Sequence, residues 1–331
     1  KAWAAIEEGR RIAPESPELD IAEAYYHYWG HLAYDEALAA LNRAIQAIPN
    51  DAELYKVKGY TLRRAGRYAE SIATLETAHE LDPRNPLAAV TLAEFAVFLG
   101  RFDEAQRWID EAGDTGPDGR WLTAWRGVLA LMADADFDRA IHYLNVAGEL
   151  NAGTIYWGWF ARLASGRHQE ALEVADFGPY TEYAAGAYPS EVMIGITHRV
   201  MGEPKLAAPM LSEAREALSQ LIESDPRYLR PMCLAAGGQQ DLDAAQNYCA
   251  EAVARARPDA FDINNVRWEA AQGLAMAGDE EGALNMLEGM LENPARVRAT
   301  VLRVDPLLEN LRDHPRFEPL LERIDQVEPL D

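Results

Sequence analysis

Two histidines near the start of the chain have the spacing of a metal site. His27 and His31 are four residues apart, so on a regular helix both imidazoles would face the same side. A third ligand such as Asp35 would then complete a site for a transition metal. We expect the helix to end near Gly30, which would separate the two imidazoles. The sequence therefore predicts two surface or turn histidines and no metal.

Three aspartates have the alternating spacing with which a calcium-binding loop begins. They are Asp134, Asp136 and Asp138. An EF-hand loop also needs glycine at its sixth position and glutamate at its twelfth. Arg139 and Asn145 stand at those two positions. We therefore predict an ordinary turn between helices, in which an aspartate side chain caps the following helix.

The two cysteines, Cys233 and Cys249, are too few for a disulfide framework or a zinc site. They fall at core positions of neighbouring predicted helices, where free cysteines usually behave as small buried hydrophobic residues. A disulfide between them is the alternative, and it requires an oxidising compartment. The sequence contains no P-loop, nucleophile-elbow or zinc-protease signature. We predict that this chain is not an enzyme and holds no cofactor.

The chain is strongly acidic. Its 331 residues include 54 Asp and Glu against 31 Lys and Arg, which gives a formal net charge of −23. Nucleic-acid binding needs a basic surface that neutralises phosphates, and the nearest approach to one is the short cluster of Arg63, Arg64 and Arg67. No run approaches the ~20 apolar residues of a membrane span. We expect no nucleic-acid partner and no membrane contact.

Helix-forming residues dominate the sequence, and residues 52–85 show how they are organised. Small residues recur where two helices would pack closely, and larger apolar residues recur between them. A glycine can end the first helix, and a proline stops the second. The small residues are Gly59, Ser71 and Ala78, the larger ones are Leu62, Tyr68 and Leu75, and the two that end helices are Gly66 and Pro83.

The same spacing returns at intervals of about 34 residues. Two helices in each unit and no strand-forming runs predict an all-α protein built from helical hairpins. Units begin near residues 17, 52, 86, 120, 156, 190, 228 and 264.

This pattern resembles the tetratricopeptide repeat over most of the chain. The resemblance implies a right-handed superhelical solenoid of about eight helix-turn-helix repeats with a C-terminal helical cap. We expect a first array over residues 1–176, starting in the second helix of a truncated repeat, and an irregular loop rich in Tyr, Pro and Gly over 177–189. A second array over 190–294 and the cap over 295–331 would follow.

The segment from Asp305 to Leu321 is similar to the end of a narrower group of proteins. Bacterial multidomain signalling proteins, among them winged-helix transcriptional regulators, class III nucleotide cyclases and Ser/Thr kinases, often end in such repeats and a similar segment. The resemblance implies a catalytic or DNA-binding domain before Lys1. It leaves a cytoplasmic and a periplasmic location open. The matching residues are Asp305, Pro306, Leu307, Leu311, Arg312, Pro315, Arg316, Phe317, Leu320 and Leu321.

The fold that the resemblance implies favours a function in binding. The first helices of such repeats line a concave face, and Tyr, Trp, Met and Arg are enriched at the centres of interfaces. We expect a non-catalytic scaffold or sensory module that binds a protein or peptide segment in an aromatic groove; core packing is the alternative for each residue. The expected groove residues are Tyr25, Tyr28, Trp29, Tyr60, Arg63, Phe98, Trp121, Met132, Tyr156, Phe160 and Ile196.

Two other functions stay open at this point. The groove or the Tyr-rich loop could enclose a small ligand, in a domain that regulates an upstream effector. The ends of the solenoid or the loop could instead pair with a second copy, which would make the chain a self-assembly module or a homodimer. The family's clamp for a terminal carboxylate is not expected, because Lys56 and Tyr60 match two of its positions but its asparagines are missing.

Overall fold

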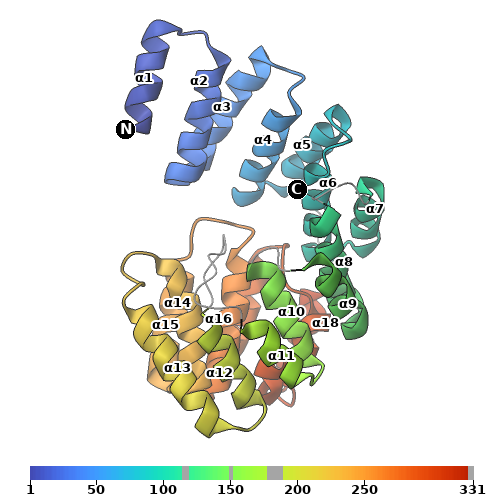
Figure 1. Ribbon diagram of the computed structural model, residues 1–331, viewed down its shortest axis with the longest axis vertical. Coiled ribbons are helices and arrows are strands. Elements are labelled where there is room, and N and C mark those ends of the chain that lie inside the picture. The colour runs from blue at the N-terminus through green and yellow to red at the C-terminus, as the bar shows by residue number, and fades with distance from the viewer. Residues whose placement is uncertain (114–118, 149–151, 177–188, 327–331) are drawn as a thin grey trace.

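The computed structural model describes residues 1–113, 119–148, 152–176 and 189–326. Every regular element in these ranges is helical, and consecutive helices pair as hairpins (Figure 1), which confirms the expected all-α solenoid. The predicted loop at 177–189 lies outside the described residues, apart from Pro189.

The helices follow one another in the order that the repeats predict. In the first half they are α1 (Ala2–Ile12), α2 (Pro17–Tyr25), the π-helical turn η1 (Tyr26–His31), α3 (Tyr34–Ala47), α4 (Ala52–Arg64), α5 (Tyr68–Leu81), α6 (Leu87–Phe98), α7 (Phe102–Ala112), α8 (Gly119–Asp134), α9 (Phe137–Ala147), α10 (Ala152–Ala164) and α11 (His168–Ala175). In the second half they are α12 (Ser190–Val200), α13 (Pro204–Ser219), η2 (Pro226–Tyr228), α14 (Leu229–Gly238), α15 (Leu242–Ala254), α16 (Ile263–Ala277), α17 (Glu280–Gly289), η3 (Met290–Glu292), α18 (Ala299–Val304), η4 (Pro306–Leu311) and α19 (Phe317–Ile324).

The turns inside the hairpins share a left-handed backbone conformation. Five hairpins place a glycine there, which accepts a positive φ without steric cost. Three others place a non-glycine residue at the same point. Five and three make eight hairpins within the described residues, in agreement with the predicted number of repeats. The glycines are Gly66, Gly100, Gly166, Gly202 and Gly278, and the others are Leu32, Ala135 and Gln240.

Small residues let the two helices of a hairpin approach closely. A Cβ atom at Gly59 in α4 would lie 2.6 Å from Leu75 Cγ in α5. Across the same interface, the Ser71 hydroxyl donates a hydrogen bond of 2.6 Å to the carbonyl of Gly59. In the hairpin of α12 and α13, a Cβ atom at Gly195 would similarly lie 2.7 Å from Leu211 Cγ. The spacing within each repeat therefore determines the hairpin.

The chain forms two regions that differ in how they are packed (Figure 1). The N-terminal arm, α1 to α5, is a row of helices with small hydrophobic clusters of its own. In the closed part, α6 to α19, one continuous core connects all of the repeats and takes in side chains of α5. The arm therefore keeps the open form of a solenoid, whereas the closed part has a shared interior.

The C-terminal segment produces this closure. It was expected at the end of the array, where η4 contacts α16, and it also packs against the middle, where α18 contacts α8. The amide of Arg296 donates to the carbonyl of Phe98 at 3.0 Å. The buried guanidinium of Arg296 donates to the carbonyls of Asn293 and Ile324, each at 3.0 Å. The segment thus covers inner surfaces that an open solenoid would expose.

The residues that could have carried chemistry have structural roles. Cys233 in α14 and Cys249 in α15 lie at the buried positions that were predicted, but they form a disulfide, so the prediction of two free cysteines is wrong and its alternative is confirmed. The Asp136 carboxylate accepts a hydrogen bond of 3.0 Å from the amide of Arg139, which confirms the predicted helix cap. His27 and His31 belong to η1, which extends one residue beyond the predicted helix end at Gly30.

Candidate functional site

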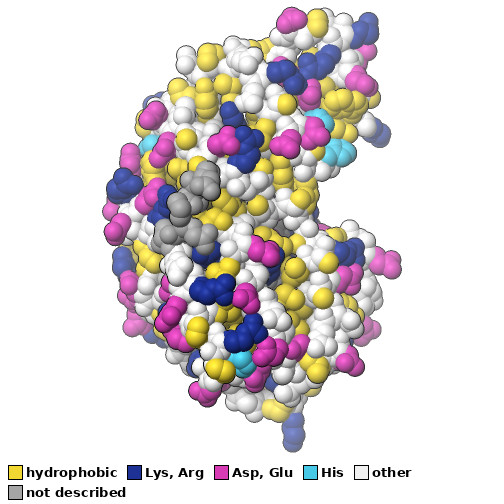
Figure 2. Space-filling view, turned by 180° about the vertical axis from the view of Figure 1, so that it is seen from behind, with side chains coloured by type: hydrophobic (Ala, Val, Ile, Leu, Met, Phe, Trp, Pro, Cys, Tyr) yellow, Lys and Arg dark blue, Asp and Glu magenta, His cyan; other side chains and the backbone are white. Residues whose placement is uncertain are grey.

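A cavity of about 320 Å³ lies between the first helices of the early repeats and residues 226–269 of the late repeats. We call it the central cavity. Helices α4, α6, α8 and α10 line one side, and η2, α14, the end of α15, α16 and the segment between α15 and α16 line the other. The outline of the molecule is notched between the arm and the closed part, and hydrophobic side chains lie along the notch (Figure 2).

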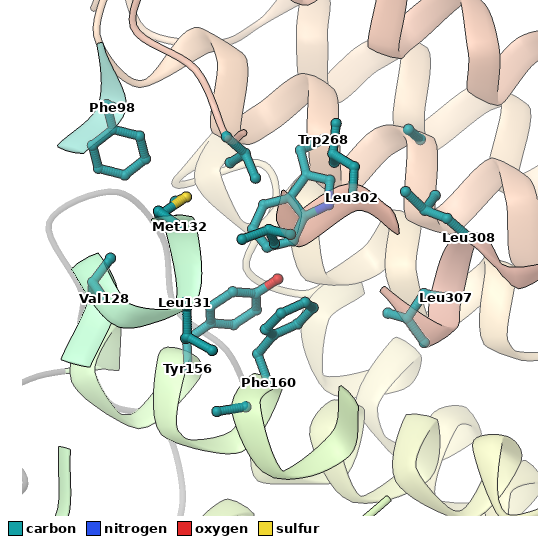
Figure 3. Packing of buried hydrophobic residues seen from close by; sticks show 14 of the residues in the cluster. Phe98, Val128, Leu131, Met132, Tyr156, Phe160, Trp268, Leu302, Leu307 and Leu308 are labelled. Carbon is teal, nitrogen blue, oxygen red and sulfur yellow. The ribbon is translucent and has the colours of Figure 1, made fainter. Parts of the chain in front are cut away.

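One wall of the central cavity is aromatic. Trp157 stacks on Trp268, with ring centroids 5.7 Å apart and an interplanar angle of 22°. Tyr156 lies edge-on to Trp268 at 5.9 Å, and Figure 3 shows its ring directed from α10 towards Trp268 on α16. Farther along the wall, Phe98 lies edge-on to Trp125 at 6.0 Å. The wall offers flat apolar faces on which a ligand can pack.

Arginine and carboxylate side chains form the rest of the lining. Arg63 donates to Glu94 at 2.6 Å, and its guanidinium lies 4.5 Å from the ring centroid of Phe261. Arg230 donates to Glu269 at 2.6 Å. Charge-assisted pairs of this kind hold the guanidinium groups in fixed positions. The lining arginines are Arg63, Arg64, Arg227, Arg230, Arg255 and Arg257, and the lining carboxylates are Glu94, Asp259, Asp262 and Glu269.

The lining therefore carries more arginines than carboxylates, in a protein whose formal net charge is −23. Arg227 and Arg255 have further partners outside the lining, Asp225 at 2.7 Å and Glu251 at 2.8 Å. Arg257 is exposed at the rim, and within the described part of the chain no carboxylate lies within ion-pair distance of it. An anionic group on a ligand would find a complementary charge at this rim.

Asp305 lies directly behind the aromatic wall, on the C-terminal segment. Its carboxylate accepts hydrogen bonds from Trp268 Nε1 at 2.9 Å, from Gln272 Nε2 at 2.7 Å and from the amide of Leu307 at 2.9 Å. Burial raises the pKa of Asp305 to about 6, and the hydrogen-bond donors oppose that rise. Burial also raises the pKa of Tyr156 well above its usual value. Asp305 thus fixes the indole that forms the centre of the wall.

Four of the predicted groove residues do line the central cavity. They are Arg63, Phe98, Trp121 and Tyr156. Each lies on the first helix of its hairpin, namely α4, α6, α8 and α10. The inner face that the repeat register predicted is therefore the face that surrounds the cavity.

Three other predicted groove residues lie in the core. Met132, Phe160 and Ile196 have no exposed surface, so the expectation that they face a partner is wrong. Figure 3 shows Met132 and Phe160 on the side of α8 and α10 that Trp268 and Leu302 cover. Closure of the solenoid, which the sequence did not reveal, converts these inner positions into buried ones.

The remaining predicted residues belong to the arm. Tyr25, Tyr28, Trp29 and Tyr60 lie on α2, η1 and α4, outside the lining of the central cavity. Tyr28 is buried, and its hydroxyl accepts a hydrogen bond of 2.9 Å from Arg64 Nε. Trp29 is 66% exposed, so it presents the largest aromatic surface of this group to solvent.

Several cavity residues were not predicted from the sequence. Trp125 follows Trp121 by one helical turn and Trp157 follows Tyr156 directly, so extending the register would have found both. Trp268 and Phe261 come from repeats more than a hundred residues later in the chain than either of these tryptophans. No local spacing connects them to the first four repeats.

The described lining of the central cavity combines aromatic rings, arginines and carboxylates. This described lining contains no Ser, Cys, His or Lys side chain that could serve as a nucleophile or base. In the described residues, no three or more His, Cys, Asp and Glu side chains are grouped so as to hold a metal ion. None of the helices in these ranges is long and apolar enough to span a membrane.

Models of the tetratricopeptide repeat match residues 26–86 and 62–131. Residues 26–131 contain tetratricopeptide repeats. The matched residues include α4, α6 and most of α8, which supply three of the four helices on one side of the central cavity. These repeats generally mediate contacts between proteins, which agrees with the character of the lining.

The chain is similar to several known proteins at low sequence identity. The chain is 22% identical over 316 residues to the TPR repeat-containing protein YpiA of Bacillus subtilis (strain 168), covering 93% of this chain and 70% of that protein. Among solved structures it is similar to Pseudomonas aeruginosa PilF, at 16% identity and a TM-score of 0.47, over 75% of this chain and 99% of that one. Yeast Tom70 is 14% identical with a TM-score of 0.46, over 97% of this chain and 60% of that one. Repeats of this kind support many functions, so these likenesses do not indicate a partner.

Proposed function

We propose that this chain is a non-catalytic protein-interaction module that binds a segment of a partner protein in the central cavity. The observation that carries the proposal is the convergence of Trp121, Trp125, Trp157 and Trp268 with six arginines on one internal surface. Tryptophan and arginine are the residues that most often dominate binding energy at interfaces. The curved row of tetratricopeptide repeats provides the scaffold that brings them together.

The lining favours a partner segment that combines a large apolar side chain with neighbouring carboxylates. The apolar side chain would pack against the tryptophan faces, where desolvation strengthens the contact. The carboxylates would approach Arg255 and Arg257, which are exposed at the rim. Because the whole protein is acidic, this recognition depends on local contacts and not on long-range attraction.

Selection of short random peptides on the immobilised protein tests the proposal. We expect the selected peptides to carry Trp, Phe or Leu next to Asp or Glu. Fluorescence anisotropy should then show that Trp121→Ala weakens binding about tenfold or more, because it removes part of the aromatic wall. Trp29→Ala is the matched control: it removes an exposed tryptophan outside the cavity and should leave the affinity unchanged.

Two results would count against the central cavity as the binding site. If the folded protein selects no peptide, the proposed function is wrong. If Trp29→Ala weakens binding and Trp121→Ala does not, the site lies on the arm. Circular dichroism of both variants shows whether each has kept its fold.

A small ligand is the second candidate, and the size of the cavity favours it. A volume of about 320 Å³ lies near the lower limit of pockets that bind small molecules. A ligand that binds only the folded state raises its stability. A thermal-shift screen of metabolites, with Trp121→Ala as the control that loses the shift, distinguishes this function from peptide binding.

The similarity of residues 305–321 to the ends of bacterial signalling proteins supports a regulatory setting for this binding. In the structure these residues help to build the cavity, because Asp305 holds Trp268 in place while Leu307 and Leu308 are buried. A regulatory signal would therefore act through the cavity.

A further inference from the structure

A short segment between α15 and α16 fastens the closed part to the arm. Residues 257–262, which we call the latch, meet the C-terminal end of α4. The amide of Ala260 donates to the carbonyl of Arg64 at 2.9 Å, and the Arg64 guanidinium forms an ion pair with Asp259. Arg64 and Asp259 are 195 residues apart in the sequence. The latch is therefore a long-range contact and not part of the repeat pattern.

Phe261 is the apolar element of the latch. Its ring centroid lies 5.3 Å from that of Phe95 and 5.2 Å from that of Phe98, both on α6. The Arg63 guanidinium of α4 lies 4.5 Å from the same ring. Phe261 is buried, so the latch inserts one side chain between two helices that precede it by more than 150 residues in the chain.

Polar contacts make up most of the remaining attachment. Asn293 donates from its side chain to the carbonyl of Ala260, and Tyr68 on α5 donates to Asn293 Oδ1 at 2.9 Å. Asp259 also shapes the latch itself, because its carboxylate accepts a hydrogen bond of 3.1 Å from the amide of Phe261. An element held by one apolar side chain and a few polar bonds opens at a lower free energy than packed helices do.

The latch also forms part of the central cavity. Four of its residues and their two partners on α4 belong to the lining, so a segment bound there would touch both sides of the contact between arm and closed part. These residues are Arg257, Asp259, Phe261 and Asp262 of the latch, and Arg63 and Arg64 of α4.

We infer that the latch opens to admit a ligand segment to the central cavity and closes over it, so that cavity occupancy and latch closure stabilise each other. The identity of the occupant rests on the proposed function, whereas the opening of the latch does not. The latch is thus the mobile side of the cavity, and the tryptophan wall is the fixed side.

Hydrogen exchange of the Ala260 amide tests the opening without any partner. Because latch opening is a local event, we expect this amide, followed by NMR with alanine-selective labelling, to exchange about a hundredfold faster than alanine amides in the middle of α16. Phe261→Ala should accelerate it by about a further tenfold. The control Phe137→Ala removes a half-buried phenylalanine on α9 and should leave the rate unchanged. Exchange of Ala260 as slow as that of α16 would overturn the inference, because the latch would then open only on global unfolding.

A cross-link between arm and latch tests the coupling. A Cβ atom at Gly66 would lie 3.2 Å from Ala260 Cβ, close to the ~3.8 Å usual for a disulfide. Oxidised Gly66→Cys/Ala260→Cys should slow both association and dissociation of a selected peptide about tenfold, because the latch can no longer open. Gly66→Cys alone has the same strain at a φ of +78° and is the control.

The results of these experiments distinguish an error in the inference about the latch from an error in the proposed function. Equal rates in the cross-linked protein and the control would overturn the coupling, even though the peptide still binds. Failure of the unmodified protein to bind any selected peptide would instead contradict the proposed function. In that case the exchange rate of Ala260 still decides whether the latch opens.

Discussion

Helices α4 and α14 are both first helices of their hairpins, but they bury very different surfaces. In the arm, α4 buries five of its thirteen residues, whereas all ten residues of α14 in the closed part are buried. The difference follows from their neighbours: α14 contacts α12, α13, α15 and α16, whereas α4 packs mainly against α3 and α5. The same repeat can therefore supply a surface helix or a core helix.

The comparison shows that repeat register predicts orientation but not exposure. Trp29 in the arm and Phe160 in the closed part were both predicted to face a groove. Trp29 is 66% exposed, and Phe160 has no exposed surface. The C-terminal segment and α16 make the difference, because they fill the inner side of the later repeats.

Substitution of Phe160 and of Trp29 should give the largest difference in lost stability between the closed part and the arm. Phe160→Ala leaves a cavity in the shared core, so we expect the free energy of unfolding to fall by about 3–5 kcal/mol. Trp29→Ala removes an exposed side chain and should change it by less than about 0.5 kcal/mol. Urea unfolding followed by circular dichroism measures both. Similar losses for the two variants would show that the arm is packed as tightly as the closed part.

The buried carboxylate of Asp305 should make the closed part sensitive to pH. Its pKa rises from 3.8 to about 6 in the folded protein, so folding favours the protonated form. The stability that Asp305 contributes is therefore largest below pH 4 and is lost as the pH rises to 6. A shift of this size corresponds to about 3 kcal/mol between pH 4 and pH 7.

Asp305→Asn removes this titration while keeping a side chain that can cap η4. We expect the stability of the variant relative to the unmodified protein to increase by about 3 kcal/mol from pH 4 to pH 7. Urea midpoints across this range provide the measurement. A constant difference between the two proteins would show that Asp305 keeps its ordinary pKa when folded.

Glycine substitutions inside the hairpins should lower the free energy of unfolding by a smaller amount, and by the same amount in the arm and in the closed part. Gly59→Ala on α4 and Gly195→Ala on α12 each bring a Cβ atom within 3 Å of a leucine on the second helix. We expect each to lower the free energy of unfolding by about 1–3 kcal/mol, because overpacking forces the helices apart. Clearly unequal losses would show that closure alters the hairpins themselves.

The hairpins were predictable because their contacts are local. Gly59, Leu62, Ser71 and Leu75 lie within one repeat, and the structure pairs them as their spacing indicates. Which side chains of the first helices face the inner side of the solenoid was predictable for the same reason. Arg63, Phe98, Trp121 and Tyr156 were predicted on that side, and they line the central cavity.

The far side of the cavity was not predictable from spacing. Phe261 and Trp268 reach the first repeats only because residues 295–326 return to α6 and α8. Contacts between residues this far apart in sequence have no periodicity to detect. The same closure explains why Met132, Phe160 and Ile196 are buried.

The return of Arg296 to Phe98 also changes how the molecule should respond to force. In a linear repeat array each unit contacts only its neighbours, so units can detach one after another from an end. Here the last segment is bonded to the middle of the array, and the closed part has no terminal repeat that can peel away by itself. Pulled from its two ends, the protein should lose the repeats of the arm in small steps and then extend through the closed part in a single larger event.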